Sequence, residues 1–281
     1  IASMAAAPPT KVLLTGASGL VAGAAYEALH TLESYDVYVL DRSSTPSERC
    51  ASRPRPNIPD DHFFVGDVSN AELVARAMQG CSIVVHLAAD PRPEAPFEST
   101  LQSNVVGTHV ILDQAKAAGV KRVVLASSIM TVFGYLTHDE PWLSLWECRI
   151  DEVKTPLPLI NVEMPPRPTE AYGASKVWGE ALARMHSDNG MSVLCVRFGW
   201  VNEEDDPSYK MNLASTWCSR RDAAALVRCA MEAAETVRFG IFFAVGNNSH
   251  VWVDTQHNTE VLGWRARDGY NLNTKQVVRG D

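Results

Sequence analysis

Short apolar runs alternate with amphipathic stretches along roughly the first two hundred residues of the chain. Runs such as Val12-Leu13-Leu14 and Ile83-Val84-Val85 have no polar face, which is typical of strands that helices cover on both sides. This alternation predicts strand–helix units in an α/β fold with a parallel sheet. The predicted strands are Lys11–Thr15, Asp36–Leu40, His62–Val65, Ser82–His86, Arg122–Ala126 and Ser192–Arg197, and the predicted helices are Leu20–Leu32, Ala71–Met78, Ser99–Ala118 and Ala171–Asn189.

Two segments interrupt this alternation. Leu136–Pro168 is rich in Pro, Trp and acidic residues without clear periodicity. We therefore expect a long loop there, and long loops in compact domains are often functional. Asn202–Thr216 is the second irregular stretch. The elements predicted after it are a helix at Arg221–Ala234, a strand at Ile241–Val245 and a short helix near Asn258–Leu262.

The composition argues against several classes of protein. Hydrophobic residues make up 46% and charged residues 21% of the 281 positions, as in ordinary globular domains. The formal charge of -8, without a cluster of Lys and Arg residues along the chain, argues against binding to nucleic acid. The six cysteines are scattered without metal-ligand spacing, so we expect no metal site and reduced thiols in the cytoplasm. Ile1–Thr10 lacks a secretory signal, and no apolar run could span a membrane.

The first predicted strand runs directly into a glycine-rich turn, Gly16-Ala17-Ser18-Gly19-Leu20-Val21-Ala22. Glycine permits a tight turn and close approach of a pyrophosphate to backbone N–H groups, and the small Ala22 lets the next helix pack on the strand. The helix N-terminus favours negative charge. Glycine turns between a strand and a helix also occur without a nucleotide, so this motif needs the support of its context.

A carboxylate ends the second predicted strand. Asp41 lies 25 residues after Gly16 (41 − 16), where it can accept hydrogen bonds from the adenosine ribose. The same charge repels a 2′-phosphate, so we expect NAD rather than NADP. Arg42 follows at once and could weaken that preference, and the alternative for Asp41 is a simple turn residue.

Tyr172 and Lys176 stand four residues apart, so a helix puts both on one face. A lysine cation close to a phenol favours the phenolate, and such a pair can exchange a proton with an alcohol. Ser128 lies just beyond the fifth predicted strand, at the edge where parallel sheets bind ligands. We expect these three residues to be catalytic. His86 ends the fourth strand and is interpreted as a packed residue rather than a base.

These residues together resemble the extended short-chain dehydrogenase/reductase group, which is NAD-dependent and epimerase/dehydratase-like. The motifs are Thr15–Ala22, Asp41, Gly66-Asp67-Val68, His86–Ala89, Asn104–Thr108, Ala126–Ser128 and Tyr172–Lys176. The resemblance implies a Rossmann-like doubly wound sheet with a small C-terminal substrate lobe, in one domain over 1–281. Residues 10–200 would form the dinucleotide core, and 200–281 mostly the lobe with returning core elements.

The resemblance also implies the roles of individual residues. The nicotinamide would lie between Ser128 and Tyr172, with Asp67 and Val68 flanking the adenine and Ala88 lining the cofactor channel. Further implied cofactor contacts are Gly16, Ser18, Gly19, Leu20, Val21, Asp41, Arg42, Leu87, Ala89, Asn104 and Lys176. A homodimer built from the helices at Ser99–Ala118 and Ala171–Asn189 is implied as well.

Within the group the chain is most similar to the uronate dehydrogenases, which oxidise the anomeric carbon of a hexuronate with NAD. Four positions depart from their pattern: Leu20 stands for a glutamine, Ile129-Met130 for an Asn-His pair, and Asn212 for a carboxylate-binding arginine. A buried polar group that loses its partner costs on the order of 1–3 kcal/mol. We therefore expect a substrate less polar than a free hexuronate, contacted by these residues. Lys210 could replace the arginine and restore the sugar hypothesis.

Two other functions stay open. One is an epimerase, isomerase or lyase that keeps NAD bound and returns the hydride to its substrate. The other is a dinucleotide-sensing regulator without turnover, although such relatives commonly lack the Tyr/Lys pair. Our leading hypothesis is an NAD-dependent oxidoreductase that acts on a secondary alcohol, a lactol or a ketone.

Overall fold

A seven-stranded parallel sheet forms the centre of the computed structural model, which describes residues 8–281 except 51, 53, 55 and 155. The strand order is β3-β2-β1-β4-β5-β6-β7, so the order reverses between β1 and β4. The strands are β1 (Thr10–Thr15), β2 (Tyr35–Asp41), β3 (Phe63–Val65), β4 (Ile83–His86), β5 (Arg122–Ser128), β6 (Ser192–Phe198) and β7 (Phe239–Ala244). This is the predicted Rossmann-like, doubly wound sheet.

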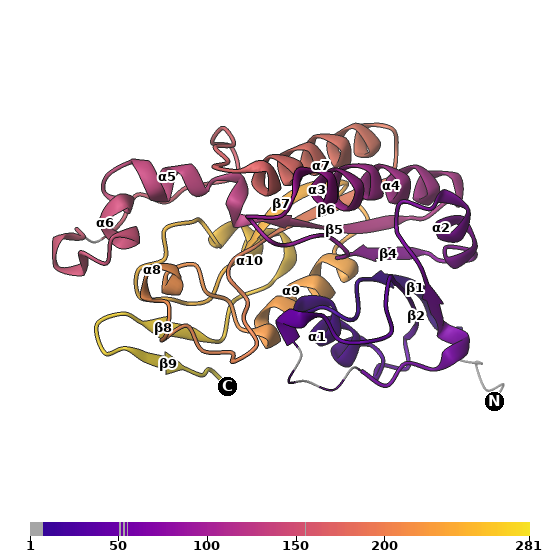
Figure 1. Ribbon diagram of the computed structural model, residues 1–281, viewed down its shortest axis with the longest axis horizontal. Coiled ribbons are helices and arrows are strands. Elements are labelled where there is room, and N and C mark those ends of the chain that lie inside the picture. Colours follow the sequence, from indigo (N-terminus) through magenta and orange to yellow (C-terminus); the bar gives the residue numbers. More distant parts are fainter. Residues whose placement is uncertain (1–7, 51, 53, 55, 155) are drawn as a thin grey trace, which may run out of the picture.

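Helices cover both faces of the sheet (Figure 1). One face carries α2 (Ala71–Ala77), α4 (Gly107–Ala117) and α7 (Ala171–Asp188), and the other carries α1 (Leu20–Leu29) and α9 (Arg220–Glu232). Each face has its own apolar cluster, which explains why the strands read as continuous apolar runs. The predicted arrangement, a parallel sheet with helices on both faces, is confirmed.

Two helices differ in detail from their predicted ranges. The single helix expected over Ser99–Ala118 is a continuous run of α3 (Phe97–Thr100), a π-helical stretch (Leu101–Val106) and α4. The short helix expected near Asn258–Leu262 begins two residues earlier, as α10 (Gln256–Leu262). Strand β5 continues two residues past its predicted end and so includes Ser128.

The prediction of a long loop over Leu136–Pro168 was wrong for the first part of that segment. It holds the end of α5 (Phe133–His138), all of α6 (Trp142–Trp146) and a 3₁₀ turn (Ile150–Glu152). These helices have at most six residues, too few to display a period, and isolated helices of that length are unstable in water. Tertiary packing supports them instead, since Leu136 and Leu145 are buried.

A separate lobe lies beside the carboxyl end of the sheet, at the left of Figure 1. Its apolar core joins residues from 129–164, 200–217 and 243–277, so the lobe uses three stretches of chain, one before β6 and two after it. It contains α8 (Met211–Ala214), which interrupts the second irregular segment, and an antiparallel pair, β8 (Gly269–Asn271) and β9 (Gln276–Val278). The sequence did not predict these three short elements.

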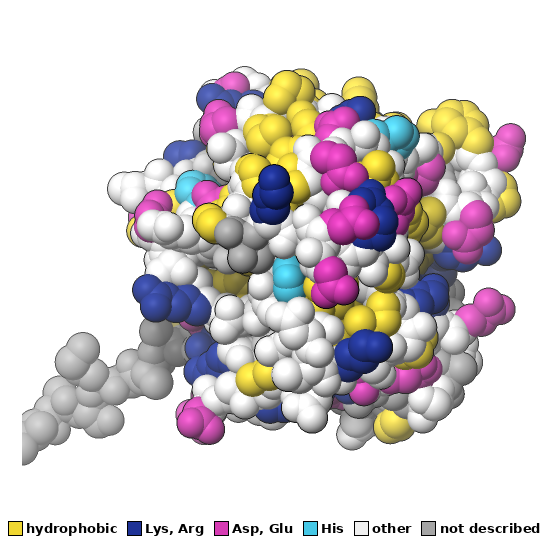
Figure 2. Space-filling view, turned by 90° about the vertical axis from the view of Figure 1, so that its left-hand side faces the viewer, with side chains coloured by type: hydrophobic (Ala, Val, Ile, Leu, Met, Phe, Trp, Pro, Cys, Tyr) yellow, Lys and Arg dark blue, Asp and Glu magenta, His cyan; other side chains and the backbone are white. Residues whose placement is uncertain are grey.

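Charges of both signs are mixed over the face that carries this lobe (Figure 2). Among the residues that the structure describes, no helix is both long and apolar enough to cross a membrane. The same described residues contain no group of three or more His, Cys, Asp or Glu side chains that could hold a metal ion.

Leu136 tests whether the corrected segment belongs to the core. Leu136→Ala removes a fully buried side chain from the lobe, so we expect the free energy of unfolding to fall by about 2–5 kcal/mol in urea titrations. Leu159→Ala is the matched control, because Leu159 lies in the same segment and is 45% exposed. It should change stability by no more than about 0.5 kcal/mol. Equal effects of the two variants would contradict the packing described here.

Candidate functional site

A cleft of about 1030 Å³ opens where β1 and β4 end. Open α/β sheets bind ligands at this edge, where the strand order reverses. The volume exceeds that of typical small-ligand pockets and suits a dinucleotide together with a small substrate. Backbone from the glycine turn forms one end of the cleft, and residues of α5, α6 and α8 form the other.

The glycine turn forms a cradle that a side chain would fill. Gly16 has φ +83°, and a Cβ atom there would lie 2.9 Å from the backbone N and Cα of Ala88. Gly19 precedes α1 without any side-chain cap, so backbone N–H groups of the first helical turn remain available to a phosphate. The Ser18 N–H donates to Asp41 Oδ2 at 2.8 Å, which fixes that carboxylate beside the turn. The residues present therefore fit a dinucleotide.

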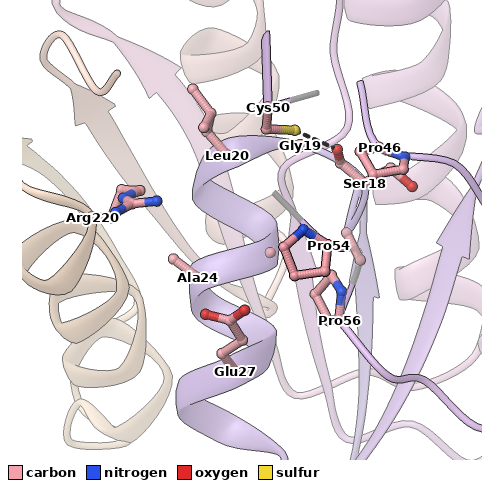
Figure 3. A pocket seen from close by; sticks show the side chains of 12 residues that line it. Ser18, Gly19, Leu20, Ala24, Glu27, Pro46, Cys50, Pro54, Pro56 and Arg220 are labelled. Carbon is pink, nitrogen blue, oxygen red and sulfur yellow. Dashed lines mark hydrogen bonds between the residues drawn. The ribbon is translucent and has the colours of Figure 1, made fainter. Parts of the chain in front are cut away.

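The loop after β2 braces this turn from outside the cleft. Ser18 O accepts hydrogen bonds from the Ser47 N–H at 2.9 Å and from Cys50 Sγ at 3.0 Å, and Ser18 Oγ donates to Ser43 O at 2.8 Å. Figure 3 shows the small hollow of about 30 Å³ between this loop and α1, with Cys50 directed at Ser18. The same loop carries Arg49 into the main cleft.

Thirteen of the fourteen predicted cofactor residues line the cleft. They are Gly16, Ser18, Gly19, Leu20, Val21, Asp41, Arg42, Asp67, Val68, Leu87, Ala88, Ala89 and Lys176. Asn104 is buried behind the wall instead. Its side chain bonds both backbone groups of Asp90 (2.8 and 3.0 Å) and donates to Ser175 Oγ at 3.2 Å. Asn104 thus supports the Asp90 turn and α7 and does not itself line the cleft.

The three predicted catalytic side chains converge. Tyr172 and Lys176 lie on the first turns of α7, and the side chain of Ser128 lies near Tyr172 at the end of β5. Lys176 is buried, its Nζ donates to Ala126 O at 3.1 Å, and Nζ lies 5.7 Å from the centre of the Tyr172 ring. Ser128 Oγ also accepts from the Met130 N–H at 3.2 Å, which fixes its orientation. All three line the cleft.

Burial dominates the electrostatics of this group. It raises the pKa of Tyr172 above its ordinary value, while the neighbouring Ser128 hydroxyl and the charge of Arg49 oppose the rise. Burial lowers the pKa of Lys176 to about 8. The expected lowering of the Tyr172 pKa by Lys176 is therefore not seen in the protein without ligands, because the loss of hydration outweighs the favourable charges.

His86 lies behind the site as a neutral, buried group. Thr15 Oγ1 accepts from the N–H groups of Leu87 and Ala88 (both 3.1 Å), so its own proton goes to His86 Nδ1 at 2.8 Å. Burial, and to a smaller extent the charge of Lys176, lowers the pKa of His86 to about 3. His86 is therefore a packed residue that holds the end of β4, as predicted, and cannot serve as a base near neutral pH.

The substrate end of the cleft is more apolar than its cofactor end. Ile129, Met130 and Lys210 line it as predicted, whereas Asn212 does not. The sequence also missed several lining residues, among them Arg49, Asp90, Arg92, Phe133 and Leu213. Trp146 and Trp200 line the cleft as well, and the sequence signalled only Trp146, through the Trp-rich segment Leu136–Pro168.

Comparisons with known proteins agree with this geometry. The NAD dependent epimerase/dehydratase family matches residues 12–202. An NAD-dependent glucose-6-phosphate dehydrogenase of Haloferax volcanii is 33% identical over 92% of this chain and 93% of its own length. An L-arabinose 1-dehydrogenase (NAD(P)(+)) of the same organism is 29% identical over 92% and 96%. The crystal structure of uronate dehydrogenase from Agrobacterium tumefaciens has a TM-score of 0.73 at 27% identity, covering 95% of this chain and 87% of that one.

The depressed pKa of His86 predicts a loss of stability in acid. Unfolded histidine takes up a proton below its ordinary pKa of 6.5, whereas folded His86 stays neutral down to about 3, so acid favours the unfolded chain within that window. Between about pH 6.5 and about pH 5, His86 should remove about 1.5 kcal/mol of stability. Urea titrations should show this loss for the wild type, and a loss smaller by that amount for His86→Asn, which keeps an acceptor near Nδ1. An identical pH dependence in both proteins would refute the assignment.

Proposed function

The chain belongs to the NAD dependent epimerase/dehydratase family, and we propose that it transfers a hydride between NAD and a secondary alcohol, a lactol or a ketone. Its relatives are NAD-dependent dehydrogenases, and it is an oxidoreductase of the short-chain type. One observation carries the proposed chemistry: a phenol, an ammonium and a hydroxyl meet in the cleft that begins at the glycine cradle. The chain would act as one unit, with its dinucleotide core at about 10–200 and most of its substrate lobe beyond 200.

The three side chains would divide the work. Bound NAD supplies the ring carbon that accepts or returns a hydride. Tyr172 takes the alcohol proton in oxidation and gives it back in reduction, and Ser128 donates a hydrogen bond to the substrate oxygen. Lys176, with a pKa of about 8, is mostly charged at neutral pH and favours the phenolate. Its bond to Ala126 O holds that charge in place.

We also propose that NAD is preferred over NADP. Asp41 supports this preference, because its carboxylate is held by Ser18 beside the glycine turn and would repel a 2′-phosphate. Arg42 lines the same part of the cleft and favours some acceptance of NADP. Initial rates with each cofactor at equal concentration would measure the ratio.

The substrate would be less polar than a free hexuronate. Ile129, Met130, Phe133 and Trp146 give that end of the cleft an apolar wall, which leaves few partners for sugar hydroxyls. A second candidate is an anionic sugar, favoured by Lys210. Within the described part of the chain no carboxylate lies within 4 Å of its ammonium, which sits 5.9 Å from the Trp200 ring centre. A panel of sugars, sugar phosphates, uronates and cyclic alcohols would separate the two.

The same panel separates an oxidoreductase from the other hypotheses. Net appearance of NADH with a substrate identifies a dehydrogenase, whereas an epimerase or lyase would convert its substrate without releasing NADH. A dinucleotide-sensing regulator would bind NAD and turn over nothing. We further propose a cytoplasmic location, which the six free cysteines support.

A homodimer is the proposed assembly. Phe97 and Leu101 are four residues apart, and Trp178 and Met185 are seven apart on α7, so each pair lies on one helix face. All four side chains are at least 39% exposed, on helices that pack against each other. A second copy related by a two-fold axis could cover this patch with the same patch. Large exposed apolar patches commonly mark such interfaces.

Tyr172→Phe removes the proposed acid/base and keeps the ring. We expect kcat to fall by about 10²–10⁴-fold, because no other group in reach can take the proton, while NAD binding measured by calorimetry stays within a factor of about two. Tyr35→Phe serves as the control, since its hydroxyl bonds only Glu232 among the described residues, far along the sequence and outside the cleft. Full activity of Tyr172→Phe would remove the basis of the mechanism.

Trp178→Glu tests the assembly. A charge in the centre of the proposed interface should convert the dimer to a monomer in light scattering behind size exclusion, since an unpaired charge is costly to bury. Val278→Glu is the comparison, because Val278 is 54% exposed on β9, away from that patch, and should leave the mass unchanged. A wild-type protein that is monomeric at all concentrations would contradict the proposal.

A further inference from the structure

A buried polar network joins β5, β6 and α7 behind the catalytic group. Glu180 on α7 accepts two hydrogen bonds from Arg197 on β6, from Nε to Oε1 at 2.7 Å and from Nη2 to Oε2 at 2.8 Å. Ser127 Oγ donates to Glu180 Oε1 at 2.6 Å. The Glu180 and Arg197 side chains are only 7% and 1% exposed, so both charges are withdrawn from water.

The network continues the catalytic face of α7 by one more turn. Tyr172, Lys176 and Glu180 are spaced by four residues, which puts them in one row along the helix. This row meets three successive residues at the end of β5. Lys176 bonds Ala126 O, Glu180 accepts from Ser127 Oγ, and Tyr172 lies near Ser128. The helix and the strand that carry the reacting groups are thus hydrogen-bonded to each other at two successive residues of the strand end.

Arg197 connects β6 to the contact between α7 and β5. It is the direct neighbour of Ser127 in the ladder between β5 and β6. Within the described residues its Nη1 has no hydrogen-bond partner, so the guanidinium depends on Glu180. A bidentate ion pair of this kind fixes the orientation of the guanidinium relative to the carboxylate.

Stability alone does not account for such a pair. Removing two charges from water costs several kcal/mol per ion, and well-packed apolar residues often stabilise a core equally well or better. What apolar residues do not provide is a fixed register, because they tolerate small slides between a helix and a sheet. A slip of one residue along α7 would move Tyr172 by about 1.5 Å relative to Ser128.

We propose that Glu180, Arg197 and Ser127 are positioning residues that set the register of α7 on β5 and thereby hold Tyr172 and Lys176 in reach of Ser128. The inference rests on the proposed function of those three catalytic groups. Glu180 and Arg197 do not line the cleft, whereas Ser127 does, so the Glu180→Gln variant and hydrogen exchange without ligand separate the positioning role from a direct ligand contact. A displacement of about 1 Å at a reacting group can cost on the order of a hundredfold in rate, so even a partial loss of register should be measurable.

The same two strands provide a matched control at their other end. Ser192 on β6 faces Arg122 on β5 in the ladder, and Ser192 Oγ accepts from Arg122 Nε at 3.0 Å. Ser192 and Ser127 are both almost fully buried, and both bond a buried charged side chain. Ser192 lies at the amino ends of the strands, away from the cleft. Ser192 Oγ also donates to Val237 O at 2.9 Å, so removing it costs at least as much as removing the Ser127 hydroxyl, whose one bond belongs to the proposed register.

The experiment compares Ser127→Ala with Ser192→Ala in the full-length protein. We expect both to lower the melting temperature by similar amounts. Ser127→Ala should reduce kcat about tenfold. It should also move the alkaline limb of the kcat pH profile up by about one unit, because a loosened Lys176 regains water and its pKa rises from about 8. Ser192→Ala should keep kcat within about a factor of two. Equal kcat losses in the two variants, or an unchanged kcat and pH profile in Ser127→Ala, would overturn the proposal.

A second readout does not depend on turnover. Amide hydrogen exchange should be faster in Ser127→Ala than in Ser192→Ala at residues 126–130 and 172–176, because these segments lose their mutual anchor. Glu180→Gln, which keeps the shape and the bond from Ser127, should show the same pattern more strongly. If the wild type oxidised no alcohol in the panel, the proposed function would fail. Amide hydrogen exchange would still test whether Ser127 and Glu180 set the register of α7 on β5. Equal exchange in all variants would overturn the inference.

Discussion

The close approach of the glycine turn to the end of β4 is the contact on which the cleft depends. Gly16 lies so near the backbone of Ala88 that no larger residue fits, and its φ of +83° suits glycine. Thr15, one residue earlier, accepts from the N–H groups of Leu87 and Ala88. The two strands between which the sheet order reverses are therefore held together at the floor of the cleft by close backbone packing and by the Thr15 hydroxyl.

Buried polar groups connect the floor of the cleft to the wall that holds Tyr172 and Lys176. His86 connects Thr15 with Thr108 near the start of α4, and Asn104 connects the Asp90 turn with α7. Such groups are expensive to bury unless each finds its partner, so a satisfied network specifies one arrangement. In the proposed mechanism, Tyr172 and Lys176 would therefore be ordered before the substrate binds.

The sequence predicted the sheet and most of the cofactor half because their signals are local. Strands covered on both faces are continuous apolar runs, and the glycine turn and the Tyr172/Lys176 pair carry their chemistry within a few residues. What the sequence did not reveal has the opposite character. That Asn104 bonds Asp90 behind the cleft wall is apparent only in three dimensions. The short helices that begin at Phe133 form because the lobe packs against them. The loop that carries Arg49 into the cleft shows no hydrophobic periodicity from which it could be predicted.

The two ends of the cleft differ in how they are built. The glycine turn contributes backbone at one end, and the family match ends near residue 202, where the chain enters the lobe for the second time. The substrate half is built from side chains, and relatives of about 30% identity carry the names of three different sugar substrates. An apolar wall discriminates between substrates by only about 1–3 kcal/mol per methylene, whereas an absent polar partner can reject a hydroxylated substrate far more strongly. In the proposed function, Ile129 and Met130 would restrict specificity through the polar contacts they do not make, and Lys210 would be able to restore one of them.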